Sequence, residues 1–94
     1  MTVLWKALAR RDMQEIYAHI AHYGGPAKGY EALAEIHIKI NALADHPSLG
    51  RAGLKPGTRH LIVRHHSTTY RATYRVRGQQ VIILRVRDTR QQGG

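Results

Sequence analysis

Arginine recurs at every second or fourth position along two neighbouring segments late in the sequence. The first segment holds Arg71, Arg75 and Arg77, and the second holds Arg85 and Arg87. A guanidinium group stays charged and can pair with a phosphate or a carboxylate through two parallel hydrogen bonds. Because residues two apart on an extended strand share a face, the spacing predicts a row of cations suited to an anionic target.

The excess positive charge lies entirely in the second half of the sequence. The 94 residues carry a formal net charge of +9. Residues 1–50 hold five Lys or Arg and five Asp or Glu, whereas residues 51–94 hold ten and one. Such asymmetry indicates a partner that is nucleic acid or an acidic protein. A basic domain with no anionic target is the simpler alternative.

The histidines do not form a recognisable metal-binding pattern. His19 and His22 are three residues apart, but no carboxylate or third histidine has clear ligand spacing to them. His65 and His66 adjoin a predicted turn and point in opposite directions if the backbone is extended. The absence of cysteine excludes disulfides and thiolate zinc sites. We therefore expect no metal site and no cofactor.

Hydrophobic spacing predicts one α+β domain over residues 1–94, in the order β-α-α-β-β-β. Its expected parts are a first strand at 1–6, a helical hairpin at 8–46 and a three-stranded antiparallel segment at 58–88. The Gly-Gly-Pro sequence at 24–26 divides the hairpin, since Gly ends helices and Pro begins them. Residues 47–57 are rich in Gly and Pro and are expected to be loop. The hairpin should pack on one face of a small, mostly antiparallel sheet.

Alternation along the last two predicted strands separates an apolar face from a polar face. A three-residue loop centred on Gly78, with positive φ at that glycine, would place Tyr74 opposite Ile82 and gather the apolar side chains on one side. The same register would set Arg71 near Arg85 on the other side. The arginine row is thus expected to line the face that the helices leave open.

Three segments, RRDMQEIYAHIA, HPSLGRAGLKPGTRHLIV and YRATYRVRGQQVIILRVRDTR, follow in an order and spacing that resembles the RelE/ParE superfamily of bacterial toxins. The resemblance covers nearly the whole chain. It implies a small toxin of a type II toxin–antitoxin pair, held inactive by an antitoxin made beside it. RelE-like members cut mRNA in the ribosomal A site without a metal, and ParE-like members poison DNA gyrase.

A RelE-like nuclease would need a base, a cation for the phosphate and an acid for the leaving oxygen. The resemblance aligns Arg71 with the arginine of a YR motif and Arg64 with a strand lysine, and His60 on the same face is a candidate base. The C-terminal segment VRDTRQQGG supplies neither the Tyr nor the His of such nucleases. Asp88 stands where many relatives have the His.

The missing proton carriers favour the ParE-like branch, in which the chain binds and poisons gyrase rather than acting as an enzyme. The expected target-binding residues are Arg64, Arg71, Arg75, Arg85, Arg87 and Arg90. We expect Asp88 to form a salt bridge with Arg85 or Arg90, and an acidic antitoxin to cover the surface. A RelE-like ribosome-dependent mRNA endonuclease, and a basic nucleic-acid-binding module or inactive toxin relative, stay as alternatives.

The sequence also predicts where in the cell the protein resides. No apolar run approaches the roughly 18 residues that a membrane span needs. The first residues, MTVLWKALARRD, lack the layout of a secretory signal. We therefore expect a cytoplasmic protein without a membrane partner.

Overall fold

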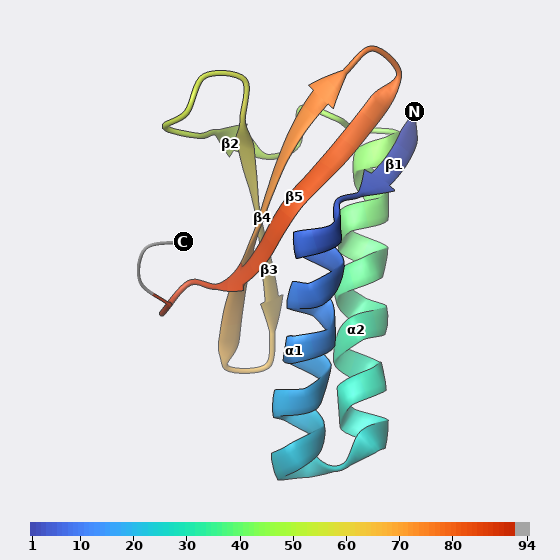
Figure 1. The fold of residues 1–94 in the computed structure, drawn as a ribbon, viewed down its shortest axis with the longest axis vertical. Helices are drawn as coiled ribbons and strands as arrows, with labels where there is room; N and C mark the ends of the chain where they lie inside the picture. The colour runs from blue at the N-terminus through green and yellow to red at the C-terminus, as the bar shows by residue number, and fades with distance from the viewer. Residues whose placement is uncertain (92–94) are drawn as a thin grey trace.

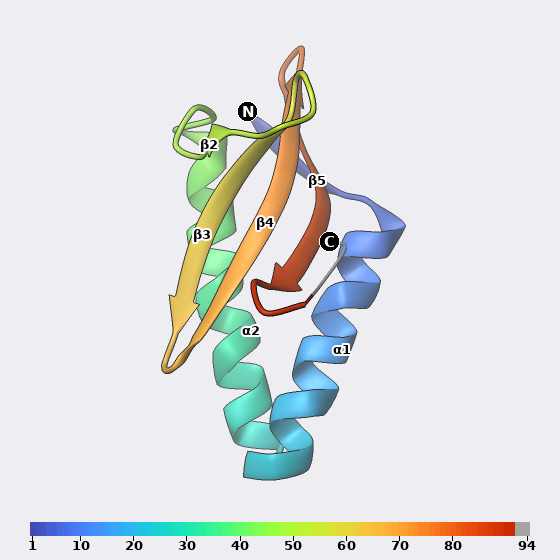
Figure 2. The same ribbon diagram turned by 90° about the vertical axis from the view of Figure 1, so that its left-hand side faces the viewer.

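Two helices cover one face of a five-stranded sheet (Figure 1 and Figure 2). The structure, a computed structural model, describes residues 1–91, so the end of the predicted domain, 92–94, lies outside the described residues. The elements are β1 (Thr2–Trp5), α1 (Ala7–Gly24), α2 (Pro26–Asn41), the 3-10 helix η1 (Ala42–Ala44), β2 (Arg51–Ala52), β3 (Arg59–His65), β4 (Thr68–Arg77) and β5 (Gln80–Asp88). The predicted fold class and element order are confirmed, with one short strand added.

The helical hairpin turns at a single glycine. Gly25 has φ of 94°, which favours a residue without a Cβ atom, and its N–H donates to the carbonyl of Ala21 at 2.9 Å. Pro26 then occupies the first turn of α2, where its missing N–H costs nothing. Within residues 1–91, no helix is long and apolar enough to cross a membrane.

The sheet has the strand order β1-β5-β4-β3-β2. β1 runs parallel to β5, and the remaining neighbours are antiparallel. The core lies between the sheet and the helices, and its largest fully buried side chains are Tyr74, Ile36, Ile40, Leu43, Ile83, Val63, Val81 and Val86. The opposite face of the sheet carries Arg71, Arg75, Arg85 and Arg87, as the alternation predicted, together with Leu84, which was expected in the core.

Two local predictions are wrong. The loop between β4 and β5 holds two residues, Gly78 and Gln79, so that Tyr74 pairs with Ile83 rather than Ile82. A bulge at Thr73/Tyr74 then shifts the register, so that Arg71 lies directly opposite Arg87 instead of Arg85, although Arg71 and Arg85 share the open face as predicted. The predicted loop at 47–57 also contains β2, which pairs with the start of β3. The predicted positive φ of Gly78 is confirmed at 58°.

Candidate binding groove

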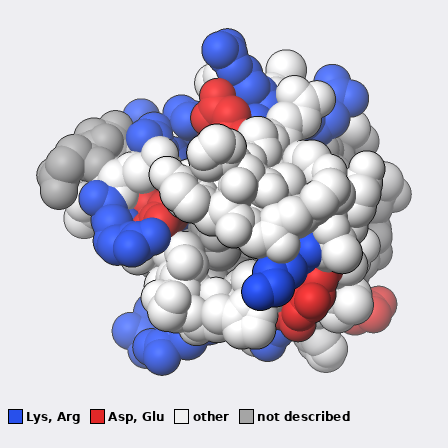
Figure 3. All heavy atoms as spheres, turned by 90° about the horizontal axis from the view of Figure 1, so that it is seen from below, with Lys and Arg blue, Asp and Glu red and all other residues white. Residues whose placement is uncertain are grey.

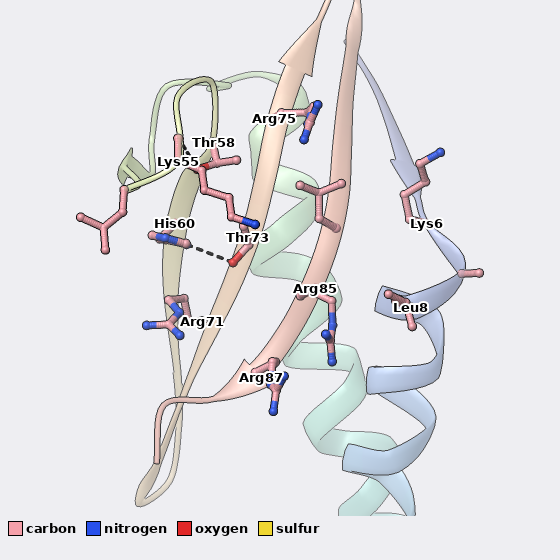
Figure 4. Close-up of a pocket in the computed structure, with 13 residues that line it drawn as sticks. Lys6, Leu8, Lys55, Thr58, His60, Arg71, Thr73, Arg75, Arg85 and Arg87 are labelled. Carbon is pink, nitrogen blue, oxygen red and sulfur yellow. Dashed lines mark hydrogen bonds between the residues drawn. The ribbon is translucent and has the colours of Figure 1, made fainter. Parts of the chain in front are cut away.

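The open face of the sheet bears a groove of about 860 Å³ (Figure 4). β3, β4 and β5 contribute to its floor, and the 54–58 loop and the start of α1 contribute to its sides. We call it the cationic groove, because its lining includes Lys6, Lys55, Arg71, Arg75, Arg85 and Arg87. Apolar side chains from Leu8, Leu54 and Leu84 complete much of the wall.

Strand register explains why these cations meet. Arg71 on β4 lies directly opposite Arg87 on β5, and Thr73 lies opposite Arg85. Like charges directly opposed across a sheet are destabilising. Within residues 1–91, no ion pair involves Arg71, Arg75 or Arg87. The groove therefore concentrates positive charge that a bound anion would neutralise.

The segment before β2 contacts the sheet through a buried hydroxyl group, and Arg59 on β3 also donates to the Gly50 carbonyl at 2.7 Å. The hydroxyl of Tyr74 donates to the carbonyl of Pro47 at 2.7 Å and accepts from the N–H of Gly50 at 2.9 Å. A Cβ atom at Gly50 would lie 2.7 Å from the Tyr74 ring, a distance that real Cβ contacts do not show. The glycine of the LGRAG segment thus permits the close approach of this segment to the core side of β4.

His60 lies on the groove floor beside Arg71 (Figure 4). Its Nδ1 is 3.0 Å from the hydroxyl oxygen of Thr73. Burial lowers the pKa of His60 from its ordinary value of 6.5, and the charge of Arg71 lowers the pKa further. The imidazole is therefore mainly neutral at pH 7.

The hairpin-like turn that carries Lys55 is also stabilised by hydrogen bonds within the turn. The hydroxyl of Thr58 donates to the Lys55 carbonyl at 2.7 Å, and the N–H of Gly53 donates to the Thr58 carbonyl at 2.8 Å. These bonds hold Lys55 and Leu54 at the rim of the groove. Sequence analysis missed both residues because a Gly/Pro-rich loop gives no periodic signal for the direction of its side chains.

Arg85 differs from the other groove arginines because a carboxylate already holds it. Its Nε and terminal nitrogen donate to the two oxygens of Asp12 on α1, at 2.8 and 3.0 Å. The same carboxylate accepts from the Val86 N–H at 2.9 Å. Hydrogen bonding to Asp12 raises the pKa of Arg85. Arg85 therefore lines the groove as a largely neutralised group and anchors the sheet to α1.

Two predicted binding residues lie outside the groove lining. Arg64 is exposed on the same open face, at the far end of β3, where it pairs with Thr69. Arg90 binds Asp88 with a shortest distance of 2.6 Å, which confirms the predicted salt bridge. The hydrogen bond from Arg90 lowers the pKa of Asp88. The structure thus groups His60, Arg71, Arg75, Arg85 and Arg87 in one groove.

Sequence comparison identifies the family to which the chain belongs. Residues 3–93 match the family described as "ParE toxin of type II toxin-antitoxin system, parDE". The chain belongs to the ParE toxin family. The predicted ParE-like branch is therefore confirmed.

Structural comparison agrees with the ParE assignment. A solved structure described as "Chromosomal ParDE TA system from P. aeruginosa" has 29% sequence identity and a TM-score of 0.81 to this chain, and the match covers 94% of this chain and 95% of that one. A search of curated proteins gave no match. Membership of the ParE family implies that the chain pairs with an antitoxin.

Proposed function

We propose that this ParE-family chain inhibits growth by poisoning DNA gyrase in the cytoplasm, with the cationic groove as its target-binding surface. The observation that carries the proposal is the pair of opposed arginines, Arg71 and Arg87, which lie in a groove with apolar walls. Arginine is enriched among the residues that dominate protein–protein binding, and the buried centre of an interface is more apolar than its rim. An acidic surface of the target would supply the missing counter-charge.

The groove lining supports binding more than proton-transfer chemistry. Among the described residues that line it, none is Asp, Glu or Tyr. Arg and Lys stay charged at neutral pH and are poor general acids or bases. The groove can therefore stabilise negative charge, while its one clear proton carrier is His60.

The test is a supercoiling and cleavage-complex assay with purified gyrase. Wild type should inhibit supercoiling at micromolar concentration, and Arg71→Ala should weaken inhibition about 30-fold, the cost of losing a hot-spot arginine. Arg64→Ala is the matched control, because Arg64 lies on the same face outside the groove lining. Absence of inhibition by wild type would reject the gyrase proposal, and equal loss in both variants would reject the groove as its centre.

We also propose that an acidic antitoxin neutralises the chain by covering this charge. Induction of the chain alone should arrest bacterial growth, and co-expression with the antitoxin from the adjacent reading frame should restore it. Growth that continues during induction, despite soluble and folded protein, would instead indicate an inactive relative or a plain nucleic-acid-binding module.

One observation favours a second candidate, the RelE-like ribosome-dependent mRNA endonuclease. A mainly neutral imidazole, His60, shares the groove with Arg71, so a candidate base lies beside a candidate phosphate ligand. This candidate predicts codon-spaced cuts in translated mRNA, mapped by primer extension after induction. His60→Gln and Arg71→Ala should each abolish those cuts, and an uncut transcript with wild type would eliminate the candidate.

A further inference from the structure

A second group of polar side chains lies on the helix side of the sheet, away from the cationic groove. Glu31, His65 and His66 each bring one potential ligand atom to within 4.8 Å of the other two. A pocket of about 410 Å³ adjoins these three residues, which we call the His–His–Glu cluster. At this end of the molecule the surface is mainly uncharged, and carboxylates and cations are both present (Figure 3).

The backbone of the β3–β4 turn brings the two histidines together. His65 ends β3 with its side chain buried toward α2. His66 has φ of 52°, in the left-handed region that His visits more readily than most residues. The centroids of the two imidazole rings consequently lie 4.3 Å apart, so the side chains do not point in opposite directions. The two side chains were expected to diverge only on an extended backbone, and His66 does not meet that condition.

A carboxylate on α2 sets the tautomer of the buried histidine. The Nδ1–H of His65 donates to Glu35, at 2.5 Å. Since the neutral imidazole carries one proton, this bond leaves the Nε2 lone pair available as a metal ligand. Metal-binding histidines almost always show this pairing of the second nitrogen with a carboxylate or carbonyl. Glu31 is four residues before Glu35, so one face of α2 supplies both carboxylates.

We propose that Glu31, His65 and His66 bind a Zn²⁺ ion, with Glu35 as the positioning residue for His65. Two imidazoles and one carboxylate form a donor set that suits Zn²⁺, and the adjoining pocket has room for water as a fourth ligand. Tetrahedral geometry requires ligand atoms roughly 3.3–3.5 Å apart. His66 Nε2 and Glu31 Oε1 are already 3.7 Å apart, and both side chains are more than half exposed and free to adjust.

The bound ion would connect two elements that are distant in sequence. Glu31 is on α2, whereas the histidines form the β3–β4 turn, so the metal would fasten that turn to the helical hairpin. Lys28 also lines the pocket, but it is exposed and can turn its ammonium group to solvent. An ion that binds only the folded chain stabilises it by mass action. This proposal is independent of the gyrase proposal, because no cluster residue lines the cationic groove.

The test is a Zn²⁺ titration of the full untagged chain, stripped of metal and followed by calorimetry. Wild type should bind one ion with saturation, and His66→Asn should weaken binding at least about 100-fold. Asn tolerates the left-handed conformation at this turn, so the variant should keep the fold. Glu35→Gln should weaken binding about 10- to 100-fold, as expected for the loss of a residue that orients a ligand.

His22→Asn is the matched control, because it removes an exposed histidine of α1 outside the cluster. This variant should bind Zn²⁺ as wild type does, and Zn²⁺ should raise the Tm of both. Co²⁺ substitution gives an independent readout, since visible absorption by the bound ion should disappear in His66→Asn. Wild type without saturable one-to-one binding, or His66→Asn with wild-type affinity, would overturn the proposal.

Discussion

Asp12 joins α1 to β5, one contact between the helical layer and the sheet. Its carboxylate is buried and accepts hydrogen bonds from the Arg85 guanidinium and the Val86 N–H. β1 pairs with β5 only from Gln80 to Ile83, so Asp12 satisfies a backbone donor beyond the end of β1. One side chain on α1 thus both completes the sheet edge and positions a groove residue.

We predict that Asp12→Asn lowers the free energy of unfolding by about 1–3 kcal/mol, because it removes charge-assisted hydrogen bonds while nearly preserving shape. Urea denaturation provides the measurement. Glu15→Gln is the control: its pair with Arg11 is exposed, and such pairs contribute less than about 1 kcal/mol. Equal stability of wild type and Asp12→Asn would show that the buried pair contributes nothing net.

His60 provides a pH-dependent prediction. Its pKa is lower in the folded chain than the ordinary 6.5, so the unfolded chain binds the proton more tightly. The stability contributed by neutral His60 is therefore complete above pH 6.5 and is lost as the pH falls toward the lower, folded-state pKa. His60→Gln should show a shallower fall in unfolding free energy between pH 7.5 and about 5.5. Parallel curves for the two proteins would contradict the lowered pKa.

At the scale of elements, sequence patterning located the helices and the long strands but misassigned the register of one hairpin. Placing Tyr74 opposite Ile82 on the apolar face requires a loop with an odd number of residues only if β4 and β5 pair without interruption. The bulge at Thr73/Tyr74 breaks that condition, so a two-residue loop and a buried Ile83 coexist. A bulge depends on tertiary packing of both faces and leaves no simple period in the sequence.

Sequence periodicity also predicted only part of the candidate sites. Parity along β3 and β4 correctly placed His60 and Arg71 on one face. It could not reveal that Asp12, 73 residues away along the chain, neutralises Arg85. Nor could it reveal that His66 adopts positive φ, since the left-handed region is a minority conformation for every residue except Gly.

The hydrogen bonds of Tyr74 give a prediction for the segment that follows the helical hairpin. Tyr74→Phe keeps the buried ring but removes the hydroxyl that binds Pro47 and Gly50. We expect a loss of about 1–3 kcal/mol in unfolding free energy, because two backbone groups lose a partner. Hydrogen exchange at the Gly50 amide should also become faster.

Tyr23→Phe controls for the loss of a tyrosine hydroxyl, because Tyr23 is 79% exposed. It should leave stability within about 0.5 kcal/mol of wild type. Exchange at Gly50 that is unchanged in Tyr74→Phe would show that the loop holds its place without this hydroxyl.

At the scale of the whole molecule, the excess positive charge and the antiparallel strands come from the same half of the sequence. The sequence from residue 51 onward carries the entire net charge of +9 and supplies β2 to β5, whereas residues 1–50 are neutral and supply the helical hairpin. Cations on one face of a small protein attract an acidic partner before contact and raise the association rate. An acidic antitoxin should therefore bind this ParE-family chain quickly at low ionic strength.

Salt should slow that association because the Debye length shrinks from about 10 Å at 0.1 M to about 3 Å at 1 M. We predict that the association rate constant, measured by stopped flow, falls about tenfold between 0.05 and 0.5 M NaCl, whereas the dissociation rate changes less. Arg71→Ala with Arg87→Ala should reduce this salt dependence. Replacement of exposed Lys28 and Lys39 on α2 by Ala removes the same charge from the neutral half and should reduce it less. A rate insensitive to salt would mean that apolar contacts, rather than the cationic groove, govern the encounter.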